Sequence, residues 1–144
     1  MIGKGRSISH LKVSINYALN HEKSKVLAKN IASEKPGDVE REFGIFQSFN
    51  DRCERNSLAF VLSPTIEDGK HLSDEALAEI NKSFLEKMNL ENHQYIAFVH
   101  DDKAHKHIHL YVNRIDSEGR AYDDTYISNR SSHTAEEIAR GKES

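Results

Sequence analysis

The chain has 144 residues, of which 37% are hydrophobic and 30% are charged, and its formal net charge is −3. This composition is typical of a soluble globular protein, and the length fits one domain that buries roughly two thirds of its unfolded surface. No apolar run approaches a membrane-spanning length, and the N-terminus does not resemble a secretory signal. We therefore expect a cytoplasmic protein without a membrane segment.

The cysteine content and the charge distribution narrow the possible partners. The single cysteine, Cys53, excludes an intramolecular disulfide and a cysteine-based zinc cluster, and we interpret it as a small apolar residue on a helix. The net charge of −3 argues against tight, sequence-independent binding to nucleic acid, which needs many cationic contacts to phosphate. Residues 1–35 nevertheless carry seven Lys and Arg against two Glu, a local excess of five. This segment is either a phosphate-facing surface or a solvated basic face.

The first third of the chain is predicted to contain two helices and one short strand. Apolar residues recur at helical spacing over residues 10–20, and Tyr17 lies off that apolar stripe. Residues 26–32 favour a short strand. A second helix is predicted to follow the break at Pro36-Gly37 and to cover residues 38–53.

The rest of the chain alternates between strands and helices. Residues 58–62 and 95–99 are continuous apolar runs, which are typical of strands covered on both faces. Between them, Ser73 is a good N-cap for a helix with an apolar stripe that ends at Met88. Residues 107–115 alternate between polar and apolar, which predicts a strand with one buried face. Thr134 and the glutamate three positions later form a capping box, which predicts a short helix beginning there.

The order of these elements indicates the fold class. Residues 101–106 are enough to close a hairpin between the two strands that flank them. Strands and helices interleave without the regular crossover spacing of a parallel sheet. We therefore predict an α+β fold with a central, largely antiparallel sheet and flanking helices. A single domain is expected over residues 1–144, shortened at its C-terminal end.

Four of the nine histidines lie within ten positions, from His100 to His109. On a strand, residues two apart point to the same face about 6.6 to 6.8 Å apart, so His107 and His109 can converge on one ion. His105 shares their face, but three such residues span roughly 13 Å, which is too far for one metal. His100 ends the neighbouring strand, and hairpin pairing would bring it beside His107. Three imidazoles leave a coordination position open, which is typical of a catalytic site.

Two other interpretations of these histidines stay open. They could be surface residues of a half-exposed strand, or an adventitious metal patch. The apolar face formed by Ile108, Leu110 and Val112 opposite the histidines favours a metal site. Asp102 either hydrogen-bonds a ligand imidazole and fixes its tautomer, or is an ordinary turn residue.

The histidine segment also resembles a known family. The pattern His-x-Asp-x-x-His-x-His-x-His-x-x-x-Asn-Arg, from His100 to Arg114, resembles the metal motif of relaxases, the HUH-type mobilization nucleases that initiate plasmid and transposon mobilization. The segments from Asn56 up to His100 follow the order of elements in that family. Near the N-terminus, residues 7–10 and 15–20 resemble the segment in which the family carries its nucleophilic tyrosine.

The resemblance implies a nuclease that binds single-stranded DNA at a transfer origin and cleaves one phosphodiester by tyrosine attack. The enzyme then stays attached to the 5′ end. The implied fold is an antiparallel sheet with flanking helices that carries the metal on two central adjacent strands. By position, the metal ligands would be His100, His107 and His109, and the nucleophile would be Tyr17.

Further residues are expected around these groups. Asp102, His105 and Asn113 are neighbours of the ligands in the motif, and Arg114 would contact phosphate. The basic N-terminal third adds three expected DNA-binding residues, Lys4, Arg6 and Lys12.

The chemistry of the parts indicates a mechanism. A bound cation neutralises the charge that grows on phosphate oxygens in the transition state. A tyrosine, with a reference pKa of about 10, is a weak nucleophile until a base or a nearby cation favours its phenolate. His10, His21 or His105 could take the proton from Tyr17. Tyr111 is the rival nucleophile because it shares the face of the metal histidines, and Tyr17 itself could be an ordinary helix tyrosine.

The expected cofactor is a divalent metal. Imidazole ligands favour Mn²⁺, Co²⁺, Ni²⁺ or Zn²⁺ in affinity, whereas cellular abundance favours Mg²⁺ or Mn²⁺, which we expect in this site. The expected partners are single-stranded DNA at a transfer origin and accessory mobilization proteins. One alternative is a rolling-circle replication initiator nuclease with a similar metal site and tyrosine. Another is a non-catalytic metal- or DNA-binding domain that keeps the histidines for stability.

Overall fold

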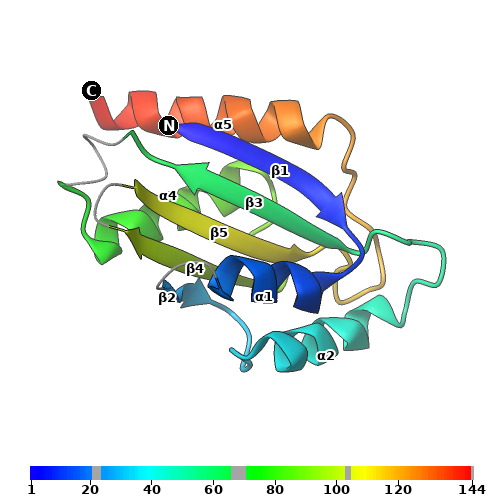
Figure 1. The fold of residues 1–144 in the computed structure, drawn as a ribbon. Coiled ribbons are helices and arrows are strands. Elements are labelled where there is room, and N and C mark those ends of the chain that lie inside the picture. Colours follow the sequence, from blue (N-terminus) through cyan, green and yellow to red (C-terminus); the bar gives the residue numbers. More distant parts are fainter. Residues whose placement is uncertain (21–23, 66–70, 103–104, 144) are drawn as a thin grey trace.

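The structure is a computed structural model that describes residues 1–20, 24–65, 71–102 and 105–143. These residues form a five-stranded sheet with helices on both faces (Figure 1). The strands are β1 (Ile2–Ile8), β2 (Ser24–Lys29), β3 (Ser57–Ser63), β4 (Tyr95–Asp102) and β5 (His105–Asn113). The helices are α1 (Leu11–Asn20), α2 (Pro36–Gln47), α4 (Asp74–Lys87) and α5 (Ile127–Glu143).

The strands are arranged in the order β1-β3-β5-β4-β2, and every neighbouring pair is antiparallel. The predicted α+β class with an antiparallel sheet is therefore confirmed. Strand β5, which carries most of the histidine segment, lies in the middle of the sheet between β3 and β4. The histidines are thus held on the central strands, where the backbone is hydrogen-bonded on both sides.

Different helices cover the two faces of the sheet. Helices α4 and α5 share one apolar core with the sheet, and α1 and α2 share another with its opposite face. On the α1 face, Ile96 and Phe98 of β4 and Tyr111 of β5 belong to the core. Further along the same face, towards the hairpin, the side chains change from apolar to histidine. The apolar part of this face anchors α1, and the histidines lie beside that packing.

The helix predicted to follow Ser73 forms as expected, whereas α2 is shorter than expected. Helix α4 begins after Ser73, whose side chain accepts a hydrogen bond from the backbone N–H of Ala76. Helix α2 ends at Gln47, so the prediction of a helix through residue 53 was wrong. The Asn50 side chain accepts hydrogen bonds from the backbone N–H groups of the second and third residues after it and so closes a turn. Cys53 consequently lies in a loop and not on a helix.

The last helix starts earlier than its capping signal predicts. Helix α5 begins at Ile127, and Thr134 is a buried residue inside the helix rather than its cap. The first two turns pack on the sheet through Ile127 and the small residue Ser131, which is fully buried and donates to the carbonyl of Ile127. A buried serine gives no hydrophobic periodicity, so the sequence pattern missed these turns.

Strand β1 was not predicted, because its buried face is made of glycine. Lys4 and Arg6 lie on one face, and Gly3 and Gly5 lie on the other, against α5 and Phe60. A Cβ atom at Gly5 would stand 2.3 Å from the Ser131 hydroxyl oxygen and 2.6 Å from the Phe60 ring. The absence of side chains at these two positions lets α5 approach the strand closely.

Replacing Gly5 with alanine is expected to destabilise the fold by about 1 to 3 kcal/mol, because the added methyl group overpacks the contact between β1 and α5. Denaturant unfolding followed by circular dichroism measures this change. The matched control is Gly44→Ala on α2, where an added Cβ meets no heavy atom within 4 Å. This control should stabilise the helix by up to about 1 kcal/mol. A Gly5→Ala variant as stable as the unchanged chain would contradict the close packing.

The two strands of the hairpin extend closer to the turn than the sequence pattern predicts, and β5 also ends earlier. Asp101 pairs with Lys106 and Asp102 pairs with His105, so residues assigned to the loop belong to the hairpin strands. Strand β5 ends at Asn113, and Ile115 forms only an isolated bridge with Ala121. Within the described part of the chain, no helix is long and apolar enough to cross a membrane.

Candidate functional site

Three histidines meet where β4 and β5 pair. His100 lies directly opposite His107, and His109 follows on the same face of β5. The ring centroids of His100 and His109 are 4.1 Å apart. His100 is 3% exposed, and the other two histidines are half-buried. The hairpin register predicted for His100 and His107 is therefore confirmed, and it gathers three imidazoles on one surface.

A serine on the neighbouring strand orients one of these rings. Ser63, at the end of β3, places its Oγ 2.9 Å from Nδ1 of His107. A hydrogen bond at one ring nitrogen fixes the orientation and the tautomer of an imidazole. Because Nδ1 makes this bond, Nε2 is the nitrogen that a metal would bind.

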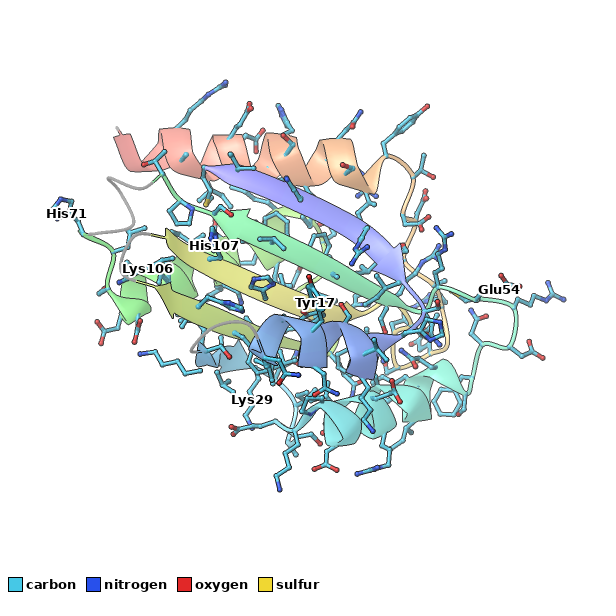
Figure 2. The ribbon with its side chains drawn as sticks, viewed as in Figure 1. Tyr17, Lys29, Glu54, His71, Lys106 and His107 are labelled. Atoms are coloured by element: carbon cyan, nitrogen blue, oxygen red, sulfur yellow. The ribbon has the colours of Figure 1, made fainter. Side chains whose placement is uncertain are left out.

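A cavity of about 460 Å³, here called the central cavity, opens over the three histidines. Tyr17 from α1 lines the same cavity, and so do Lys4 and Arg6 from β1. Figure 2 shows Tyr17 on α1 and His107 on β5 above the same face of the sheet. The central cavity thus brings together the predicted nucleophile from α1 and the predicted metal ligands from β4 and β5. Strand β1 adds two of the predicted DNA-binding residues.

The two candidate tyrosines have opposite environments. Tyr17 is 71% exposed, because the buried stripe of α1 consists of Leu11, Ile15 and Ala18. Tyr111 is 3% exposed, and its hydroxyl donates to the Ser14 carbonyl at 3.4 Å. Burial raises the pKa of Tyr111, and this effect outweighs the opposing effects of the Ser14 contact and of nearby Arg6. A phenolate is therefore harder to form at Tyr111 than at an ordinary tyrosine.

Two further cavities adjoin the central one on opposite sides. The Tyr17-side cavity, of about 380 Å³, shares Arg6, Ser14 and Tyr17 with it and is also lined by His10 and Arg55. The His107-side cavity, of about 480 Å³, shares Lys4, Val61 and His107. Among the described residues, the lysines and arginines that line the three cavities are Lys4, Arg6 and Arg55, and no Asp or Glu lines them. These three adjoining cavities, here called the trough, are therefore lined by positive charge among the described residues, although the formal net charge of the whole chain is −3.

Several predicted residues do not reach the central cavity. Lys12 lies on the other side of α1, where its backbone N–H donates to Glu40 and its side chain lies near Gly37. His10 lines the Tyr17-side cavity only. The side chains of Asp102 and His105, and the whole of His21, lie outside the described residues.

The last two residues of the histidine motif hold the fold together. The Asn113 amide is fully buried, accepts hydrogen bonds from Gln47 and the Ile115 N–H, and donates to the Phe43 carbonyl and Gln94. It thus joins α2, the start of β4 and the end of β5.

The Arg114 guanidinium is also engaged within the protein. It donates to the carbonyls of Tyr122 and Arg55 and to the Cys53 sulfur, and it pairs with Asp124 at 3.3 Å. These contacts fix the loop after α2, and they place Arg114 away from the three cavities that adjoin the histidines.

Sequence patterns overlooked two residues that the fold brings to the site. Arg55 lies in a polar loop with no periodic signal, and only the packing of that loop brings it beside Tyr17 in one cavity. Ser63 stands one residue beyond the predicted strand 58–62, and its contact with His107 depends on the β3–β5 register.

The donor set of the central cavity fits a divalent transition metal, because three imidazoles on adjacent strands are ligands that such ions accept. Their positions in the structure do not by themselves form a site. Within the described part of the chain, no group of three or more His, Cys, Asp and Glu side chains is arranged to hold a metal ion. Binding would therefore need the side chains of His100, His107 and His109 to move relative to one another.

Comparison with known protein families gives one match that spans nearly the whole chain. Residues 17–143 match the family described as "Relaxase: MobA/VirD2-like, nuclease domain". The chain therefore belongs to the relaxase family, whose nuclease domains nick DNA in mobilization and generally depend on a metal. The matched region includes Tyr17 and all three histidines. No curated protein and no solved structure matched the chain.

Proposed function

We propose that this chain nicks one strand of DNA at a transfer origin by a tyrosine transesterification that requires a divalent cation. The observation that supports this proposal best is the composition of the central cavity. One exposed tyrosine from α1 faces it together with three histidines from β4 and β5 and two cations from β1. These are the groups needed to attack a phosphodiester and to stabilise its charge.

The substrate proposed is single-stranded DNA. Lys4, Arg6 and Arg55 follow the trough past Tyr17 and can contact successive phosphates. Indiscriminate binding to duplex DNA needs many Lys and Arg contacts to phosphate, and a chain with a net charge of −3 is poorly suited to it. At the transfer origin the chain would act with accessory mobilization proteins.

In the proposed step, the Tyr17 phenol oxygen forms a bond to phosphorus and the bond from phosphorus to the 3′-oxygen breaks. The phenol loses its proton to a base, and the departing 3′-oxygen takes a proton from water. His10 lines the Tyr17-side cavity together with Tyr17 and is the base we propose. The product is a 5′-phosphotyrosine ester, which retains much of the energy of the broken bond. A free 3′-hydroxyl can therefore reseal the strand without a nucleotide cofactor.

His100, His107 and His109 are the proposed metal ligands, with Mg²⁺ or Mn²⁺ as the expected ion. When bound, the cation would neutralise the charge that develops on the phosphate oxygens. Lys4 and Arg6 contribute to the same stabilisation from β1, and they also orient the phosphate towards Tyr17.

The experiment that tests the proposed function is the detection of a covalent protein–DNA adduct. The chain is incubated with single-stranded DNA that contains a transfer origin, with Mn²⁺ or with a chelator. A protease-sensitive band of reduced mobility should form only with the metal, and a fully duplex version of the same DNA should give little of it. A chain that binds this DNA but never forms the adduct would be a binding module and not a nuclease.

Ser63 provides a separate test of the metal ligands. Replacing Ser63 with alanine should weaken metal binding about tenfold, because the His107 ring loses the hydrogen bond that orients it. Calorimetric titration with Mn²⁺ measures the affinity. The free energy of unfolding should fall by no more than about 1 kcal/mol, since only one half-buried hydrogen bond is removed.

The matched control for Ser63→Ala is Ser57→Ala. Ser57 lies at the other end of β3, where its hydroxyl contacts Gln47. Its removal should leave metal affinity unchanged. Equal metal affinities for both variants and the unchanged chain would show that Ser63 has no part in placing His107.

A further inference from the structure

The His107-side cavity has the character of a small-molecule subsite. Its volume of about 480 Å³ is within the range of roughly 300 to 1,000 Å³ that is common for such sites. Ile2, Val61 and Pro64 give it apolar walls, and the Ile2 side chain is 62% exposed. An isolated apolar side chain on an edge strand is well placed to contact a flat, weakly polar group.

The position of this cavity relative to the tyrosine is defined by the residues they share. His107 and Lys4 line both the central and the His107-side cavity, whereas Tyr17 lines the central and the Tyr17-side cavity but not the His107-side one. His107 therefore lies where the central cavity meets the His107-side cavity, and Tyr17 lies where the central cavity meets the Tyr17-side cavity.

Phosphoryl transfer constrains where the leaving group lies. The attacking and departing oxygens are roughly in line on opposite sides of phosphorus. With the phosphate held at the histidines and Tyr17 on one side, the 3′-oxygen leaves on the side that faces the His107-side cavity.

We propose that the His107-side cavity binds the nucleoside that carries the departing 3′-oxygen, with its base against Ile2, Val61 and Pro64. This inference rests on the proposed function. Lys4 stands at the boundary between the two cavities and contacts the phosphate that joins the two nucleosides. The strand on the 5′-phosphate side then continues past Tyr17 towards Arg6 and Arg55. The subsite gives the trough a strand polarity and selects the base immediately before the nick.

The test uses single-stranded DNA with a randomised central stretch, Mn²⁺ and the whole chain. Each cleavage leaves one fragment on the protein and releases another with a free 3′-hydroxyl. Sequencing the released fragments gives the base preference before the nick, and sequencing the protein-bound fragments gives the preference after it. The Ile2→Ala variant should reduce the preference at the last base of the released fragment by about threefold or more, because base contact with the apolar wall is lost. The preference after the nick should stay the same.

Two variants serve as controls. Ile45 on α2 is equally exposed, at 61%, and lines none of the three cavities, so Ile45→Ala should leave both preferences unchanged. Val13 lines the Tyr17-side cavity, and Val13→Ala should change only the preference after the nick. If adducts form and Ile2→Ala leaves the base before the nick unaffected, the subsite is refuted while the nuclease stands. If no adduct forms with any DNA, the proposed function fails and the subsite with it.

Discussion

The Tyr17→Phe variant is expected to lose the covalent protein–DNA adduct, with a decrease on the order of a thousandfold or more, because phenylalanine has no oxygen to attack phosphorus. Folding should be unchanged within about 0.5 kcal/mol, since the Tyr17 ring is 71% exposed and outside the buried stripe of α1. Metal affinity and single-stranded DNA binding should also be retained. Gel mobility measures the adduct, and fluorescence anisotropy measures DNA binding.

Tyr111→Phe is the matched control for this variant. The Tyr111 hydroxyl is buried and donates to the Ser14 carbonyl in α1, so its removal should have a small effect on stability and leave the adduct in place. Mass spectrometry of the trapped adduct should locate the nucleotide on the peptide that contains Tyr17. Its presence on the Tyr111 peptide, or an undiminished adduct in Tyr17→Phe, would refute the assignment of the nucleophile.

The double variant His107→Ala, His109→Ala is expected to lose metal binding by more than about a hundredfold. Loss of a residue that merely orients a ligand commonly costs 10- to 100-fold in affinity, and this variant removes two of the three proposed ligands themselves. Calorimetric titration with Mn²⁺ gives the affinity, and adduct formation should fall in parallel. Both side chains are half-buried at the cavity wall, so the fold should persist.

The control for the histidine pair removes two imidazoles elsewhere. His71 before α4 and His133 on α5 are exposed and line none of the three cavities. The variant His71→Ala, His133→Ala should therefore bind Mn²⁺ as the unchanged chain does. If both double variants bound the metal with equal affinity, the site would lie elsewhere in the protein.

The amino-acid sequence by itself determined the class of fold and the histidine pair at its centre. Two apolar runs and one alternating segment predicted three of the strands, and the short connection between β4 and β5 was enough to close a hairpin. Once that hairpin forms, His100 must lie near His107, because antiparallel pairing places opposite residues on one face. The Ser73 cap and the apolar stripe fixed α4 in the same way. These features are local, so short segments of the sequence specify them.

The tertiary structure alone decided what surrounds the histidines. Strand β1 has glycine where a strand normally shows apolar residues, because α5 packs against its backbone, and so no period of two marked it. Its pairing with β3 sets Lys4 opposite Val61 and thereby places a lysine beside the histidines. Long-range packing also turned the Arg114 side chain inward, where it donates to the Arg55 carbonyl and holds that loop. The same loop places Arg55 at the wall of the Tyr17-side cavity. Contacts between segments far apart in the chain have no local signature, which is why no sequence pattern marked Arg55 and the motif did not reveal the internal contacts of Arg114.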